Sequence, residues 1–182
     1  MSARSRAVRR RPGPGRPGPE RGVSLVEVLL AVVVLSAGFL AAARLQVQSL
    51  ATSQNAYALS QAKLMALEMG ERLRANRAGV RAGLYDGLVT AAGTAPPACL
   101  ADATGCSPAA IRDADRHAWS RRLHAVDADP GFVALLPSAD GIDARGSVAR
   151  VAGSDVRVVS VAWAERTAAG PERREVAVRV TP

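Results

Sequence analysis

Aromatic residues, histidine and cysteine are scarce in this chain of 182 residues, which contains two each of Phe, Tyr, Trp, His and Cys. Six aromatic side chains are too few to predict the stacking surface on which single-stranded nucleic acids bind. The two histidines, His117 and His124, lie seven positions apart, whereas the histidines of a helical zinc site usually lie four apart. We therefore expect neither a metal site nor a cofactor.

Sequence signatures of catalysis are also missing. The chain has no Gly-x-Ser-x-Gly nucleophile turn and no Walker-type phosphate-binding loop. Its closely spaced acids, Asp127 with Asp129 and Asp140 with Asp143, lack the ligand spacing of an EF-hand loop and lie where Asp favours turns. The sequence thus predicts a protein that is not an enzyme and has no catalytic residue.

Proline does not occur between Pro19 and Pro96, so nothing in this stretch interrupts a helix. We predict one continuous helix over residues 23–76, about 80 Å long at the rise of an α-helix. Residues 23–43 are almost entirely apolar and, at about 31 Å, match the hydrocarbon thickness of a bilayer. Residues 44–78 make up its amphipathic half, with a helix stop at Asn76 and Gly79. A stripe in this half is predicted to pack on a domain or on a neighbouring helix: Leu59, Ala62, Ala66, Met69 and Leu73.

Positive charge is concentrated at the start of the chain. Residues 1–22 carry seven arginines and one glutamate, which accounts for +6 of the net charge of +8 and leaves +2 for the other 160 residues. Repeated Pro-Gly pairs make this stretch incompatible with a helix. We interpret residues 1–22 as a basic leader that remains in the cytoplasm by the positive-inside rule, so the net charge is weak evidence for nucleic-acid binding.

One carboxylate, Glu27, lies inside the apolar segment, where a charge costs about 2.5–3.5 kcal/mol on insertion scales. A secretory signal peptide cleaved after residues 41–43 would have an unusually long apolar centre containing this acid. A plain membrane anchor leaves Glu27 unexplained. Alternatively, cleavage after Gly22 creates an α-amino group on Val23, about 6 Å from Glu27 along the helix axis. That amine, of the same or a neighbouring subunit, would compensate the carboxylate.

The run from Gly22 to Glu27 resembles the class III leader of type IV prepilins and pseudopilins, in which a glycine precedes the cut and a glutamate stands fifth after it. Here Val23 replaces the usual phenylalanine at the first mature position. The resemblance implies cleavage by prepilin peptidase after Gly22 and methylation of Val23. It also implies that Glu27 is an assembly contact with the amine of an adjacent subunit.

Other stretches resemble the PilV family of minor pilins, the type IV pilus modification proteins. The helix end at residues 69–76 matches the family pattern Met-x-x-Arg-(Met/Leu)-Arg-x-Asn. The resemblance implies a single-pass inner-membrane protein with a periplasmic C-terminal domain, which enters the assembled pilus or reaches the cell surface. It implies a role in assembly, initiation or modification of the pilus. The implied partners are other pilins and minor pilins, prepilin peptidase, and the pilus assembly machinery.

Residues 79–182 are predicted to form a globular head, which makes the fold α+β and type IV pilin-like. Residues 79–106 are predicted to be loop, and a helix follows from the cap Ser107 and Pro108 to about Val126. Its apolar face contains Ile111, Ala114, Ala118, Trp119, Leu123 and Val126. Three strands are predicted as an antiparallel meander that packs on the amphipathic helix: Ser147–Val151, Asp155–Glu165 and Glu175–Val180.

Two clusters, one in the head and one at the end of the long helix, leave alternatives open. Cys99 and Cys106 are predicted to form a disulfide if the head lies outside the cytoplasm, with a free pair or a metal pair as the alternatives. Arg72, Arg74, Arg77 and Arg81 are a basic cluster for which we favour a solvated face or a subunit interface over a nucleic-acid surface. The alternative functions are a type II secretion pseudopilin and a DNA-uptake or adhesion subunit.

Overall fold

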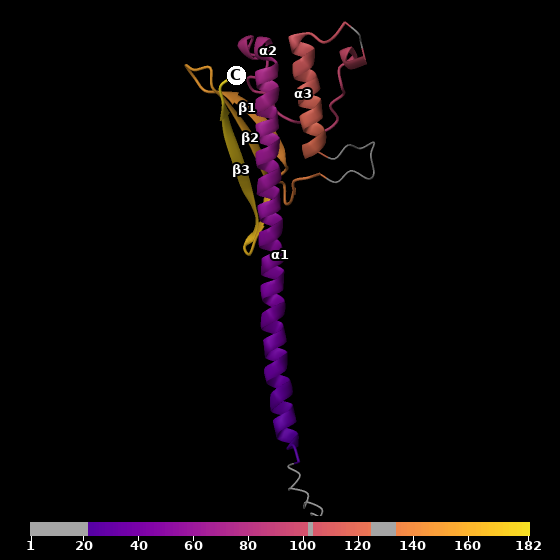
Figure 1. Ribbon diagram of the computed structural model, residues 1–182, viewed down its shortest axis with the longest axis vertical. Coiled ribbons are helices and arrows are strands. Elements are labelled where there is room, and N and C mark those ends of the chain that lie inside the picture. The colour runs from indigo at the N-terminus through magenta and orange to yellow at the C-terminus, as the bar shows by residue number, and fades with distance from the viewer. Residues whose placement is uncertain (1–21, 102–103, 125–133) are drawn as a thin grey trace, which may run out of the picture. The chain divides into compact units, whose positions relative to one another are not determined.

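A computed structural model describes residues 22–101, 104–124 and 134–182 of the chain (Figure 1). Its elements, in chain order, are α1 (Leu25–Ala75), α2 (Arg77–Arg81), the 3-10 helix η1 (Ala98–Ala101), α3 (Pro108–Leu123), β1 (Arg145–Arg150), β2 (Arg157–Thr167) and β3 (Gly170–Val180). The chain divides into two compact units, Met1–Leu45 and Gln46–Pro182, and α1 contributes to both. The leader predicted at residues 1–22 lies, apart from Gly22, outside the described residues.

The described part of the first unit consists of Gly22, Val23, Ser24 and the beginning of α1. The sequence predicts a helix start at Val23, but the helix begins two residues later. The carbonyl of Ser24 accepts the backbone N–H groups of Glu27 at 3.0 Å and Val28 at 3.2 Å, and this sets the first turn. Within the described residues, α1 is the one helix that is long and apolar enough to cross a membrane. None of the residues in its most apolar stretch is buried.

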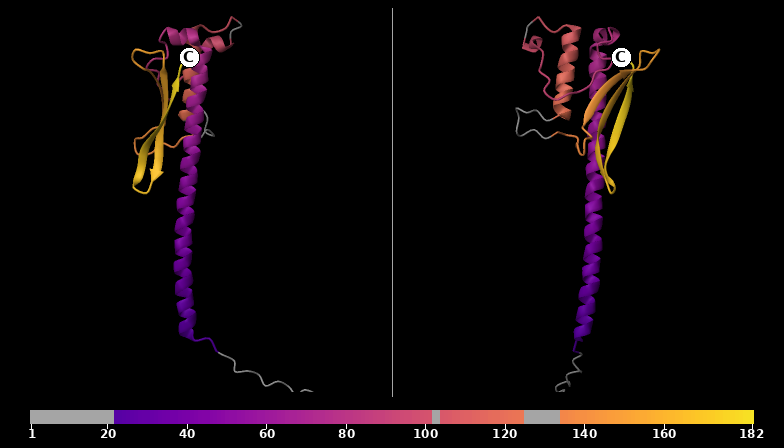
Figure 2. Two further views of the ribbon diagram at one scale, coloured as in Figure 1. Left: turned by 60° about the vertical axis from the view of Figure 1, so that its left-hand side comes forward. Right: turned by 180° about the vertical axis from the view of Figure 1, so that it is seen from behind.

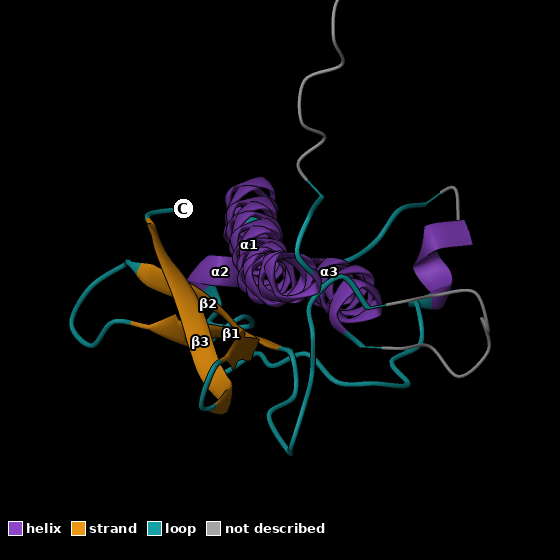
Figure 3. Cartoon of the chain, turned by 90° about the horizontal axis from the view of Figure 1, so that it is seen from below, coloured by secondary structure: helices purple, strands orange, loops and turns teal. Residues whose placement is uncertain are grey.

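The second unit is built on a three-stranded antiparallel sheet in the order β1-β2-β3, as the sequence predicts. Val148 pairs with Val159, and Val161 pairs with Val176. The predicted strands are correct in order, but β3 begins five residues earlier than predicted and β2 extends two residues further. The part of α1 that belongs to the second unit, from Gln46 to Ala75, lies between the sheet and α3 (Figures 1 and 3). The fold is therefore α+β, with a long N-terminal helix and a head of helices and one small sheet.

The core of the second unit forms where α1, α3 and the sheet meet. Four of the five residues in the predicted stripe of α1 are buried there: Ala62, Ala66, Met69 and Leu73. Leu59 does not join this core and is 50% exposed, because the buried side of the helix instead includes Ala58 and Met65. From α3, Trp119 and Leu123 enter the core, and β2 adds Val159, Val161 and Trp163.

One glycine allows α3 to approach the sheet closely. A Cβ atom at Gly146 of β1 would lie 2.6 Å from the ring of Trp119, so only glycine permits this contact between β1 and α3.

The cap of α3 is as predicted, since the hydroxyl of Ser107 accepts the N–H of Ala110. The helix ends at Leu123, earlier than predicted, because His124 adopts an extended backbone conformation. Val126 and the acids Asp127 and Asp129 lie outside the described residues.

The segment predicted as loop, residues 79–106, contains more structure than expected. It includes the end of α2 and all of η1, and it forms a short pairing with the outer edge of β1. Figure 2 shows α2 as a short helix beside the C-terminal end of α1. Gly87 donates its N–H to the carbonyl of Val148 at 3.0 Å, and Val148 donates to the carbonyl of Leu88 at 2.9 Å. Pairing of this kind depends on a strand about 60 residues away in the chain, so a local sequence pattern could not reveal it.

Candidate functional site

The first candidate site is the beginning of α1, where the residues predicted to take part in cleavage and assembly lie. Gly22 and Val23 precede the helix, and Glu27 lies in its first turn, where the helix dipole favours a negative charge. The residues around Glu27 are apolar and exposed, including Leu25, Val26 and Val28. Among the described residues, no cation comes within 4.0 Å of the Glu27 carboxylate to form an ion pair.

A row of exposed apolar side chains lies along the part of α1 that belongs to the second unit, on the side of the helix turned away from the core. Leu50, Tyr57 and Leu64 are each more than half exposed and lie at intervals of seven residues. Seven residues make nearly two turns, so these side chains share one side of the helix, and the spacing is typical of helix-to-helix packing. The prediction from the sequence did not include this exposed row, although its seven-residue spacing can be read directly from the sequence.

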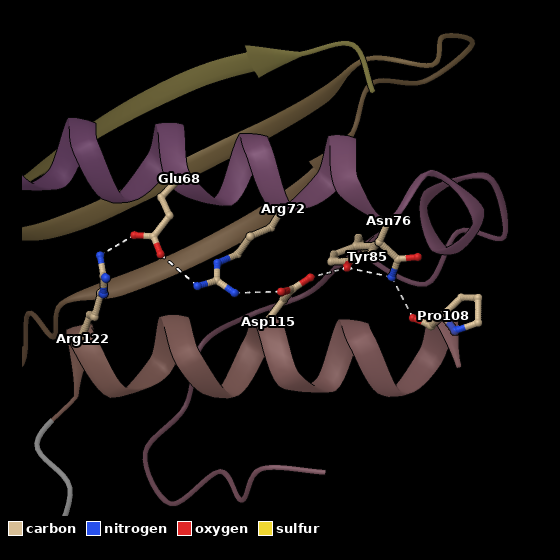
Figure 4. A network of polar contacts seen from close by, with 7 residues as sticks. All are labelled: Glu68, Arg72, Asn76, Tyr85, Pro108, Asp115 and Arg122. Carbon is tan, nitrogen blue, oxygen red and sulfur yellow. Dashed lines mark hydrogen bonds and ion pairs between the residues drawn. The ribbon is translucent and has the colours of Figure 1, made fainter. Parts of the chain in front are cut away.

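The second candidate site is the basic cluster at the end of α1, and the structure divides it. Arg72 turns toward α3, where its guanidinium donates to Glu68 and to Asp115, each at 2.9 Å (Figure 4). Burial lowers the pKa of Arg72, but the hydrogen bonds to Glu68 and Asp115 outweigh burial and raise it. Glu68 also pairs with Arg122 of α3. Arg72 is therefore engaged inside the head and is not part of an open basic surface.

The same network continues past Asp115 to the end of α1. The hydroxyl of Tyr85 donates to Asp115 at 2.6 Å, and the side-chain amide of Asn76 donates to that hydroxyl at 3.0 Å and to the carbonyl of Pro108 at 2.8 Å (Figure 4). Burial, and then the bond to Asp115, raises the pKa of Tyr85. Asn76 also caps α2, because its side-chain oxygen accepts the N–H of Gly79 at 3.1 Å. The predicted helix stop thus joins α1, α2 and α3.

The other three arginines of the basic cluster have different surroundings. Arg74 is paired with Glu71 one turn away on the surface of α1. Arg77 and Arg81 are the first and last residues of α2, and both are exposed. They line a hollow together with Arg150, which comes from the end of β1. The structure therefore does not bring the four predicted arginines together on one face.

The other residues of the head that the sequence singled out make contacts that stabilise its loops. Cys99 and Cys106 form a disulfide with their Cα atoms 5.2 Å apart. His117 donates through Nδ1 to the carbonyl of Thr94 at 2.7 Å, and His124 contacts the hydroxyl of Thr90 through Nε2 at 3.0 Å. Asp140 has a positive φ of 49° in the turn beside the bridge of Ala139 with Ile142. In the described part of the chain, no three side chains of His, Cys, Asp or Glu gather as a metal site would require.

The comparisons with known proteins do not add a family to these observations. No family model matches the chain, no curated protein matches it, and no solved structure matches it.

Proposed function

We propose that the protein is a minor pilin, a membrane-inserted subunit that takes part in assembly, initiation or modification of a type IV pilus. Prepilin peptidase removes the leader after Gly22, and the mature chain begins at Val23. Residues 23–43 hold the chain in the inner membrane, with the head in the periplasm, until it enters the pilus. The protein acts through contacts with other pilins and not as an enzyme.

The observation that carries this proposal is the position of Glu27. It lies in the first turn of an exposed apolar helix, five residues after Gly22, with no cation beside it among the described residues. An uncompensated carboxylate in such a segment is costly, and a free amine on Val23 of a neighbouring subunit would remove the cost. That intermolecular contact also sets the stagger between two packed helices, which a contact within one chain would not do.

The part of α1 that follows the apolar segment supplies a second support for a role in assembly. The exposed row Leu50, Tyr57 and Leu64 extends the apolar surface of α1 beyond the segment that would lie in a membrane. Exposed apolar side chains at this spacing are typical of a surface that packs against other helices. The two observations together fit a subunit whose helix packs into a bundle while its disulfide-bonded head remains outside.

Mass spectrometry of the mature N-terminus tests the proposal. We expect the chain purified from membranes to begin at Val23, with or without a methyl group on its amine. A chain that begins at Arg44 would show a secreted domain released by signal peptidase, and an intact leader would show a plain anchor. Either result would overturn the proposal.

A pseudopilin of type II secretion would share this N-terminus, so a second measurement separates the two. Shearing releases surface pili from cells, and a minor pilin should be found in the sheared fraction. A protein that is absent from that fraction, and whose deletion blocks secretion of an exoprotein while piliation continues, would be a pseudopilin.

A further inference from the structure

A polar hollow lies where α2, the turn between β1 and β2, and the end of β3 meet. Its volume is about 220 Å³, and all of its lining belongs to the second unit. The lining residues are Arg77, Val80, Arg81, Arg150, Asp155, Arg157 and Pro182. We call this site the arginine hollow. Four of its seven lining residues are arginines, and one is an acid.

The four arginines differ in whether their charge is already compensated. Arg157 is 2% exposed, and its Nε lies 2.6 Å from Asp86 in an ion pair whose geometry is not that of a hydrogen bond. Its other nitrogens donate to the carbonyls of Val80 and Asp155 at 3.2 and 3.1 Å. Arg157 therefore belongs to the floor of the hollow, and its charge is satisfied within the head.

The other three arginines are exposed and largely unpaired. Arg77 and Arg81 have no carboxylate within 4.0 Å among the residues that the structure describes. Arg150 donates through Nε to the carbonyl of Ser154 at 3.1 Å. Its one carboxylate partner within the described residues is Asp155, at 3.9 Å, and the side chain of that acid is 93% exposed. Three guanidinium groups thus share the hollow with one acidic side chain, that of the loosely held Asp155. Mutual repulsion of these cations would be relieved by an anion from another molecule.

The elements that carry these arginines are fixed in place. Arg77 and Arg81 lie one turn apart on α2, so they project from the same side of the helix. The N-terminus of α2 is capped by Asn76, and Arg157 holds the carbonyl of Val80 in the same helix. Because the helix is anchored at both points, little backbone ordering is needed when an anion binds.

We propose that the arginine hollow binds an acidic segment of a partner protein through its Asp or Glu carboxylates. The planar guanidinium group bonds a carboxylate with two parallel hydrogen bonds, and this geometry favours arginine at such contacts. A hollow of about 220 Å³ has room for carboxylate side chains without any rearrangement of α2. The proposal rests on the hollow alone, so it does not depend on the chain being a pilin.

Two observations favour a protein over a nucleic acid as the partner. The hollow has no aromatic side chain for base stacking, since Trp119, Trp163 and Tyr85 are buried in the core. Asp155 also lies on its rim, and this carboxylate would repel the evenly charged backbone of a polynucleotide. A protein segment with separate acids can place its carboxylates beside the arginines and leave Asp155 in water.

Binding of a labelled hexaglutamate peptide to the full chain in detergent tests the proposal at low salt. We expect the triple variant Arg77→Gln, Arg81→Gln and Arg150→Gln to bind about tenfold more weakly, because three charge-assisted bonds are lost. The matched control is Arg121→Gln, Arg166→Gln and Arg179→Gln, three exposed arginines outside the hollow that give the same change in net charge. The control variant should bind the peptide nearly as well as the original chain.

Three results would overturn the proposal. Equal weakening in the two triple variants would show that only net charge matters. Complete competition by inorganic phosphate would show that the hollow is a site for small anions. A nucleic-acid site would be shown if a short DNA duplex binds more tightly than the peptide and loses affinity only in the hollow variant.

Fluorescence of the buried Trp119 and Trp163 checks that each variant is folded. The triple variant Arg77→Lys, Arg81→Lys and Arg150→Lys should restore only part of the affinity, since lysine keeps the charge but not the planar guanidinium group.

Discussion

Asp115 is the residue on which the polar contacts between α1 and α3 depend. One of its carboxylate oxygens accepts from Arg72 and the other accepts from Tyr85, and its side chain is 9% exposed. A partly buried charge is stable only while its partners remain in place. The end of α1 therefore has a structural role, since Arg72 and Asn76 both belong to this network.

We expect Asp115→Asn to lower the free energy of unfolding of the head by about 2 kcal/mol. The amide keeps the size of the side chain but leaves Arg72 without one of its two carboxylates, and its NH2 group cannot accept a hydrogen bond. Urea unfolding followed by the fluorescence of the buried tryptophans measures the change.

The control for this substitution is Asp113→Asn on the same helix. Asp113 pairs with Arg112 at the surface, and its side chain is 48% exposed. Surface pairs contribute little, so the control should change the free energy of unfolding by less than about 0.5 kcal/mol. Equal losses for Asp115→Asn and Asp113→Asn would show that the network does not stabilise the head.

At the scale of elements, α3 holds the segment that covers the outer edge of β1. Arg116 donates to the carbonyl of Val89 at 3.0 Å, and the hydroxyl of Ser120 accepts the N–H of Ala91 at 3.2 Å. Both histidines of the chain contact the same segment, at Thr94 and Thr90. The edge of a sheet left open would expose unpaired backbone groups, so this attachment protects β1.

The contact of His124 predicts that the head is less stable in acid. Burial lowers the pKa of His124 below its ordinary value of 6.5, although the charge of Asp143 works in the opposite direction. The unfolded chain then binds a proton more readily than the folded chain as the pH falls below about 6.5. Stability should be constant above that pH and should decrease as the pH falls through the lower pKa of the folded state.

Urea midpoints measured across this range, in the original chain and in His124→Gln, test the assignment. Part of the loss in acid should disappear in the variant, because glutamine does not titrate. If the two chains lose the same stability between neutral and mildly acidic pH, another group is responsible for the acid effect.

At the scale of the whole molecule, the two compact units differ in their chemistry. The described part of the first unit is apolar and exposed, with Glu27 as the charge near its start. The second unit contains the core, the disulfide and the ion pairs of the head. An exposed apolar helix is stable in a membrane or against other helices, so the first unit requires an environment that the chain does not itself supply.

We expect Glu27→Gln to leave cleavage after Gly22 intact and to reduce entry into pili about tenfold or more. The substitution removes the charge that would compensate the amine of a neighbouring Val23, and an uncompensated charge in lipid costs about 2.5–3.5 kcal/mol. Mass spectrometry of the N-terminus and immunoblots of sheared pili measure the two steps separately. Glu71→Gln is the matched control, because Glu71 lies on the same helix in a surface pair with Arg74. Normal incorporation of Glu27→Gln would contradict the assembly role.

Local patterns in the sequence were sufficient for much of the fold. The absence of proline between Pro19 and Pro96 indicated the long helix, Ser107 and Pro108 indicated the start of α3, and alternation of valines indicated the meander. These features depend on backbone preferences and side-chain periodicity within a few residues, which a single sequence contains. The predicted boundaries of α1 and of the strands were less accurate, because hydrogen bonds at the ends of elements are shared with neighbouring turns.

The sequence by itself determined the order of the elements, the apolar helix with its early glutamate, and the pair of cysteines available for a disulfide. Only the tertiary structure decided how the arginines are divided. Arg72 is held by Asp115, 43 positions later in the chain, whereas Arg81 shares a hollow with Arg150. Arginines that are close together in the sequence therefore have different roles, because the charge that each side chain meets comes from segments that only folding brings together.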